Sequence, residues 1–303
     1  MASSGIGGQA VMEGVMMKNK DQYAVAVRKP DHSIIVEKKE YHSIVKSEKL
    51  REIPIIRGVV NFVDSLVLGM STLTFSASFF EEEEEAEKTE KSEKKEKAAM
   101  GFTVFLSIIL AVAIFMILPF YISLLFQKVI TSRTIIIILE GIIRLAIFIL
   151  YILLISRMED IQRVFMYHGA EHKCINCIEH GLELTVENVR NSSKEHKRCG
   201  TSFLFYVIVI SIIVTLFIQV DSRLLRLVLR LVIIPLVAGI SYEFIRLAGR
   251  SNNPIVNLFS KPGLLMQKLT TKEPDDEMIE VGMASVEAVF DWKAYISDKS
   301  NFS

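Results

Sequence analysis

Two long apolar blocks dominate the chain, at roughly 101–156 and 202–249. Each block divides into two runs that are long enough to cross about 30 Å of hydrocarbon at a helical rise of ~1.5 Å per residue. Very short polar segments join the two runs of a block, so each block predicts a tight helical hairpin. The pattern indicates a mainly α-helical, polytopic membrane protein with about four transmembrane helices, over 101–126, 134–156, 202–220 and 224–249.

A weaker apolar pattern precedes these blocks. Residues 58–80 place their apolar side chains along one helical stripe and hold polar side chains elsewhere. This pattern favours an amphipathic helix that lies along the membrane surface, with a re-entrant or packed span as the alternative. The glutamate- and lysine-rich stretch 81–100 is typical of a charged linker between the N-terminal part and the membrane body.

The N-terminal segment 1–57 predicts a small cytosolic α+β part. Residues 23–28 and 33–37 have strand-like composition, and the turn residues between them indicate a β-hairpin. The glycine pair Gly7-Gly8 upstream suits a tight loop or a close backbone approach. The tail, 250–303, is polar, and a helix is expected in it from Asp275 to about Ser297.

The distribution of charged residues predicts how the chain is oriented in the membrane. The chain has 35 basic and 35 acidic residues, so no overall positive field suggests nucleic acid as a partner. The basic residues gather in 1–57, in 157–201 and in the tail, and the positive-inside rule therefore places these segments and both termini in the cytosol. The lipid bilayer is the expected partner, and a homo-oligomer or other membrane proteins are further candidates.

The expected working centre lies in the cytosolic His/Cys segment 157–201. His168-Gly-Ala-Glu171-His172 reads H-x-x-E-H, and residues four apart on a helix share one face. Two imidazoles on one face can hold Zn²⁺, with Glu171 as the general base for an activated water. His196 and Cys199 are the candidates for a third ligand. This set predicts a metal-dependent hydrolase that acts on a peptide bond, a lipid ester or a phosphate.

A competing ligand set uses the same segment. Cys174-x-x-Cys177 together with His196-x-x-Cys199 has a spacing similar to a zinc ribbon. Such a site would be four-coordinate, closed and structural. The protein would then be a non-catalytic membrane scaffold or a partner-binding protein.

Charged residues also interrupt the apolar runs. Glu140 and Arg144 lie four apart in the second run and are expected to neutralise each other inside the bundle. A transporter that uses this pair is a third hypothesis, although the short third run and the lack of internal repeats count against it. Glu243 lies near the cytosolic end of the last run and is a candidate second-shell partner of the histidine cluster.

Five motifs, in order along the chain, resemble the YqhQ-like membrane proteins of bacteria. They are GGQAVMEGVMM at 7–17, YHGAEH at 167–172, LTVENVR at 184–190, RCGTSF at 198–203 and QKLTTKEP at 267–274. This family has no established function and is often labelled a predicted metal-dependent enzyme. The resemblance implies a multi-pass protein of the bacterial plasma membrane.

The same resemblance bears on the candidate site. The family pattern matches His168, Glu171, His172, His196 and Cys199, whereas the Cys174-x-x-Cys177 pair is not part of it. The first motif also contains Gln9 and Glu13, which are candidate ligands or second-shell residues of the cluster.

Overall fold

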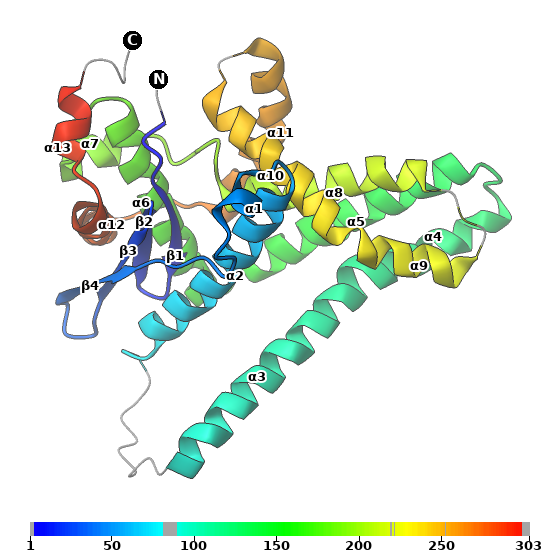
Figure 1. The fold of residues 1–303 in the computed structure, drawn as a ribbon, viewed down its shortest axis with the longest axis horizontal. Helices are drawn as coiled ribbons and strands as arrows, with labels where there is room; N and C mark the ends of the chain where they lie inside the picture. Colours follow the sequence, from blue (N-terminus) through cyan, green and yellow to red (C-terminus); the bar gives the residue numbers. More distant parts are fainter. Residues whose placement is uncertain (1–2, 81–89, 219, 221, 252, 299–303) are drawn as a thin grey trace. The chain divides into compact units, whose positions relative to one another are not determined.

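The chain is mainly helical, with one four-stranded antiparallel sheet (Figure 1). This computed structural model describes residues 3–80, 90–218, 220, 222–251 and 253–298. The predicted fold class is confirmed at this level. Of the expected charged linker, residues 81–89 lie outside the described part, and the helix α3 begins at Glu90.

Two compact units make up the structure. The first, called the sheet unit, comprises Met1–Phe80, Ile152–Val207 and Ile234–Ser303. The second, called the helical unit, comprises Glu81–Tyr151 and Ile208–Ile233.

The sheet is a simple meander in which each strand is antiparallel to the next. The predicted hairpin is confirmed by β3 and β4, whereas the glycine-rich segment before it forms a second hairpin and not a tight loop. Glu13 makes the turn of this second hairpin with a φ of 48°. The strands are β1 (Gly7–Val11), β2 (Gly14–Asn19), β3 (Gln22–Arg28) and β4 (Ile34–Glu40).

Both faces of the sheet are covered. Helices α6 (Glu159–Glu179) and α12 (Asp276–Val289) pack on one face, with Val15 and Ala24 among the buried residues. Helix α2 (Ile56–Ala77) packs on the other face, over Met16 and Val25. Because neighbouring strand residues point to opposite faces, two buried faces require the continuous apolar runs of β2 and β3. This packing fixes α6, which carries most of the candidate site.

Helix α2 buries polar side chains on one face and exposes apolar side chains on the other. It buries polar residues against the sheet unit: Asp64, for example, accepts hydrogen bonds of 2.6 Å from both Tyr41 and Ser43. Its other face exposes apolar residues and is long and apolar enough to count as a membrane span. Whether α2 lies along the membrane or crosses it stays a prediction. The exposed apolar residues are Val63, Leu66, Val67, Met70 and Leu73.

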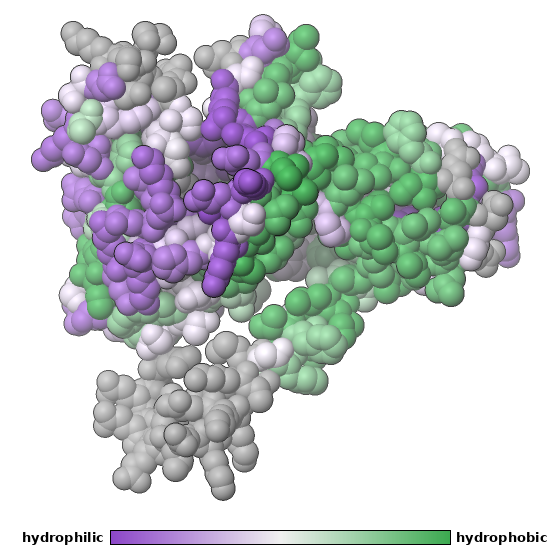
Figure 2. Space-filling model, viewed as in Figure 1, coloured by the Kyte–Doolittle hydropathy of each residue, from purple (hydrophilic) through white to green (hydrophobic). Residues whose placement is uncertain are grey.

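The helical unit contains α3 (Glu90–Val112), α4 (Leu118–Leu125), α9 (Arg223–Val232) and parts of α5 (Arg133–Ile155) and α8 (Gly200–Phe217). A π-helical turn joins α3 to α4 just before Pro119, which has no N–H to continue the normal helical ladder. Apolar side chains cover the exterior of these helices (Figure 2), as at Phe102, Ile142 and Leu224.

Four helices of the described residues are long and apolar enough to cross a membrane. The run predicted over 224–249 is divided into two helices, α9 and α10 (Ile234–Arg250), which meet at a bend of 42° and together are long and apolar enough for one broken span. Pro235, in the first turn of α10, cannot hydrogen-bond back into α9 and explains the break. The four helices are Ile56–Ala77, Gly101–Lys128, Arg133–Ile155 and Gly200–Phe217.

The remaining elements are helical. Segment 157–201 is largely helical, because α6 is followed by the short α7 (Val186–Asn191). The expected tail helix is divided at Phe290-Asp291 into two. These elements are α1 (Glu48–Glu52), the 3-10 turn Phe126–Lys128, α11 (Pro254–Thr270) and, after α12, α13 (Trp292–Ser297).

Candidate metal centre

Helix α6 presents His168 and His172 on one face, one turn apart. Its other faces are held in the core between the sheet and α12 by Ala170, Cys174 and Ile178. The helix therefore cannot rotate, and both imidazoles project toward the segment that leads into α8.

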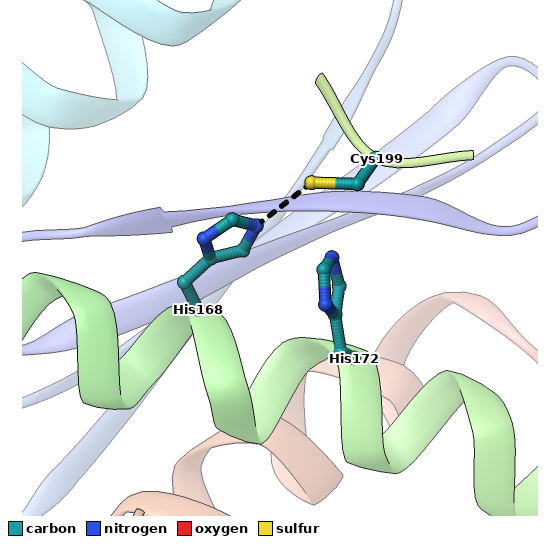
Figure 3. A group of neighbouring side chains, drawn as sticks. All are labelled: His168, His172 and Cys199. Atoms are coloured by element: carbon teal, nitrogen blue, oxygen red, sulfur yellow. Dashed lines mark hydrogen bonds between the residues drawn. The ribbon is translucent and has the colours of Figure 1, made fainter. Parts of the chain in front are cut away.

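Three donor groups converge at this face (Figure 3). His168 Nε2 lies 3.2 Å from Cys199 Sγ, and the two imidazole centroids are 4.4 Å apart. One ligand atom from each of His168, His172 and Cys199 lies within 4.8 Å of the others. This donor set could hold a metal ion.

Backbone carbonyls fix both imidazoles. His168 Nδ1 lies 2.9 Å from the Thr270 carbonyl oxygen, and His172 Nδ1 lies 2.6 Å from that of Lys194. A carbonyl oxygen only accepts, so each Nδ1 carries a proton and donates it. The Nε2 of each neutral ring is then left with its lone pair for the cluster. Metal-binding histidines commonly have this kind of second-shell support.

Glu171 lies beside both imidazoles. Its Oε2 is 3.5 Å from His172 Nε2 and 3.9 Å from His168 Nε2. Burial raises the pKa of Glu171 to about 7, against the opposing effects of His168, Arg198 and the Gly8 amide. The carboxyl group can therefore gain or lose a proton near neutral pH.

Strand β1 approaches Glu171 very closely at Gly8. A Cβ at this position would lie 2.7 Å from Glu171 Cγ and 2.8 Å from the Met16 carbonyl oxygen. The close backbone approach expected for the glycine pair is confirmed at Gly8. A cavity of about 90 Å³ lies beside this contact and has room for several waters. Its lining includes Gly7, Gly8, His168, Glu171, His172, Arg198 and Cys199.

His196 is not brought into the donor set. Its Nε2 lies 3.4 Å from Glu179 Oε2, and Gln267 clamps its backbone by accepting from its N–H (2.8 Å) and donating to its carbonyl (2.7 Å). Burial lowers the pKa of His196 to about 4, so the ring is neutral. This residue holds the segment before Cys199 in place.

The two other cysteines lie in the apolar core. Cys174 packs against Gly282 of α12, and the Cys177 thiol lies 3.3 Å from the Glu183 carbonyl oxygen. Burial raises the pKa of both thiols. The structure does not bring the zinc-ribbon set, which pairs these thiols with His196 and Cys199, together.

Three residues expected near the cluster have other partners in the sheet unit. Gln9 reaches α2, on the opposite face of the sheet from α6, and Glu13 lies at the turn of the β1–β2 hairpin. Glu243 belongs to α10. Their partners are Thr72 for Gln9, Arg163 and Tyr167 for Glu13, and Arg57 for Glu243.

Other residues support the site without having been assigned a role from the sequence. Arg198 donates to Glu179 at 2.6 Å, and Glu179 also accepts from the backbone N–H and hydroxyl of Ser4. The N-terminal segment is thereby tied to the end of α6. Gly169 is needed because a Cβ there would collide with the Lys272 carbonyl oxygen. In the sequence, the motifs that begin at Arg198 and Gln267 were the signal that could have identified such supporting residues.

Comparison with known proteins agrees with the motif resemblance. A family described as protein of unknown function (DUF1385) matches residues 53–292. The uncharacterized protein YqhQ of Bacillus subtilis (strain 168) is 36% identical over 289 residues, which cover 92% of this chain and 90% of that protein. No solved structure matches.

Proposed function

Since the chain belongs to the DUF1385 family, whose function is unknown, we propose from its site that it is a membrane-bound, zinc-dependent hydrolase. The observation that carries this proposal is the convergence of two backbone-oriented Nε2 atoms and the Cys199 thiol next to a buried carboxyl group. The substrate bond is a peptide, a lipid ester or a phosphate ester.

The donor chemistry supports zinc. Two neutral imidazoles and one thiolate are usual zinc ligands, and bond lengths of ~2.0–2.3 Å put tetrahedral donors ~3.5 Å apart. The Nε2–Sγ pair at 3.2 Å is near that separation, and the widest pair, within 4.8 Å, has to close by about 1 Å. Three protein ligands leave a fourth position open, as in catalytic zinc sites.

The chain's own residues supply the rest of the chemistry. Bound zinc would act as a Lewis acid that makes water reactive near neutral pH. Glu171, beside both imidazoles, accepts the proton of the attacking water and returns it to the leaving group. The Gly8 amide holds this carboxylate in position.

The membrane setting is part of the proposal. The apolar exterior of the helical unit and the outward apolar face of α2 support insertion into a bilayer, with α2 along its surface. The distribution of basic residues supports a multi-pass plasma-membrane protein with both termini and the cluster on the cytosolic side. A homo-oligomer or another membrane protein as partner stays part of the proposal.

Metal analysis of detergent-purified protein tests the site. We expect about one zinc per chain in the wild type and less than about a tenth of that in His172→Ala. His180→Ala is the matched control, because His180 caps the same helix and its Nδ1 binds the Asn176 carbonyl, away from the cluster. A wild type without stoichiometric metal contradicts the proposal.

Glu171→Gln tests catalysis separately from binding. We expect full metal content, and a loss of at least about 100-fold in hydrolysis of a panel of ester, peptide and phosphoester probes. If metal is present and Glu171→Gln keeps full function in cells, the cluster is a structural staple.

A purely structural role of the cluster, in a non-catalytic scaffold protein, is the second candidate function, and one observation favours it. The cluster ties together the strand β1, helix α6, the segment before α8 and the end of α11 around a small cavity. A non-catalytic scaffold held together in this way would bind metal and tolerate Glu171→Gln.

A further inference from the structure

Three helices of the helical unit bury a second cluster of charge. Glu140 on α5 is 3% exposed and Arg230 on α9 is 5% exposed. Glu140 Oε1 lies 2.5 Å from Arg230 Nη1 and 3.0 Å from Arg144 Nη2. Arg144 also donates to the Ser211 hydroxyl of α8 at 2.8 Å. The expected neutral pair of Glu140 and Arg144 therefore has an additional cation.

The charges of this cluster do not balance. Two guanidinium groups contact one oxygen of a single carboxylate, so these three side chains together carry one net positive charge. An unpaired charge inside an apolar bundle is costly, so a counter-ion lowers the free energy of the folded protein.

Hydrogen-bond donors are also in excess. Arg144 Nε and Arg230 Nε are buried and make no hydrogen bond within the described structure. The Arg230 guanidinium lies 4.8 Å from the ring centre of Phe120. The ring stabilises the positive charge through a cation–π contact, but it gives the Arg230 N–H groups no oxygen acceptor. Guanidinium groups match the oxygens of a phosphate group, which offers several acceptors at once.

The position of the cluster suits a ligand that arrives from the end of the bundle. Glu140 and Arg230 each lie seven residues into a helix, α5 from Arg133 and α9 from Arg223, or about 10 Å at the helical rise. The opposite face of α9 exposes Leu224 and Val228, which lipid chains would cover.

We propose that Arg144 and Arg230, beside Glu140, form a binding site for a phosphate oxyanion. The phosphate belongs either to the headgroup of an anionic phospholipid or to free inorganic phosphate. The site is separate from the metal centre, and it does not depend on the hydrolase proposal.

Binding by the full-length, detergent-purified protein tests this site. The probes are phosphatidylglycerol against phosphatidylcholine, followed by native mass spectrometry, and inorganic phosphate against chloride, followed by thermal shift. We expect preferential binding of phosphatidylglycerol or stabilisation by phosphate, and the arm that responds identifies the source. Arg230→Gln should weaken this binding at least tenfold. Arg250→Gln, on the exposed last turn of α10, is the matched control and should keep it.

Glu140→Gln separates an anion site from a simple ion pair, and it serves if Arg230→Gln does not fold. Removing the competing carboxylate should strengthen phosphate or phosphatidylglycerol binding by at least about threefold. The proposal is overturned if neither phosphate probe binds better than its neutral or chloride counterpart. It is also overturned if Glu140→Gln leaves binding unchanged or weaker, or if Arg230→Gln and Arg250→Gln lose affinity equally.

Discussion

The candidate metal centre of the sheet unit and the arginine cluster of the helical unit bury polar groups in opposite ways. At the metal centre, backbone carbonyls of Thr270 and Lys194 take up the N–H of each imidazole, so the lone pairs remain. In the helical unit, side chains pair with one another, and arginine N–H groups remain.

This difference decides which ligand each cluster can attract. Remaining lone pairs favour a cation, and remaining N–H groups with excess positive charge favour an anion. The net charge of the chain is zero, yet the chain buries one cluster that favours a cation and another that favours an anion.

The largest effect is expected from Cys199→Ser. Loss of the thiolate ligand should weaken zinc binding by more than about 100-fold, since even second-shell changes cost ~10–100-fold. Competition with a chromophoric chelator measures this affinity. Glu140→Gln, in the other cluster, should leave it unchanged, and a comparable loss in both variants would show that the two clusters are not independent.

Gly8→Ala should damage the metal centre through its carboxylate. The added Cβ collides with Glu171 and with the β2 backbone, which should reduce the free energy of unfolding by about 1–3 kcal/mol. Gly7→Ala is the matched control, because a Cβ there meets nothing within 4 Å, and it should stay within about 0.5 kcal/mol. Denaturation in mild detergent measures both variants. Equal stability of the two variants would contradict the close approach.

Acid should weaken the sheet unit through His196. Its folded pKa of about 4 lies below the ordinary histidine value of 6.5, so the unfolded chain gains a proton first as pH falls. The contribution of His196 to the free energy of unfolding should therefore fall by about 2–3 kcal/mol between pH 6.5 and 4.

His196→Asn should remove this slope, and Arg230→Gln should keep it. Thermal unfolding of the wild type and His196→Asn between pH 6.5 and 5 measures the difference between their slopes, in which the opposite contribution of Glu171, with its raised pKa of about 7, cancels. In that range Glu179 stays charged: burial raises its pKa, but His196 and Arg198 outweigh burial and hold it at about 2. An unchanged slope in His196→Asn would exclude this residue as the cause.

The smallest effect on metal is expected from Cys177→Ala. This thiol lies in the core and contacts the Glu183 carbonyl, so zinc content should stay within about a tenth of the wild-type value. Metal analysis of the purified variant measures it. Loss of metal would favour the zinc-ribbon set instead.

The sequence predicted the elements that depend on local periodicity. Four-residue spacing placed His168 and His172 on one face, and apolar length identified the helices. It could not choose between His196 and Cys199, because the choice depends on Gln267, which clamps the His196 backbone from 71 residues away.

Strand geometry explains the misplaced Gln9. Adjacent strand residues point to opposite faces of a sheet. Gly8 therefore meets Glu171 of α6, and Gln9 reaches Thr72 of α2. Without recognition of β1 as a strand, the sequence does not show that Gln9 points away from the cluster. Pro235 is a local sequence signal for the bend between α9 and α10. A prediction made from the length of the apolar run alone misses this bend.

The contact between His168 and the Thr270 carbonyl also sets an order of events during biosynthesis. These residues are 102 positions apart, so at ~5–20 residues per second the carbonyl emerges from the ribosome several seconds after the imidazole. Helices α8, α9 and α10 are translated in that interval. A nascent chain that ends before Thr270 has the histidines but not the orientation of His168. Under the proposed function, metal would therefore be acquired only after these helices have been translated.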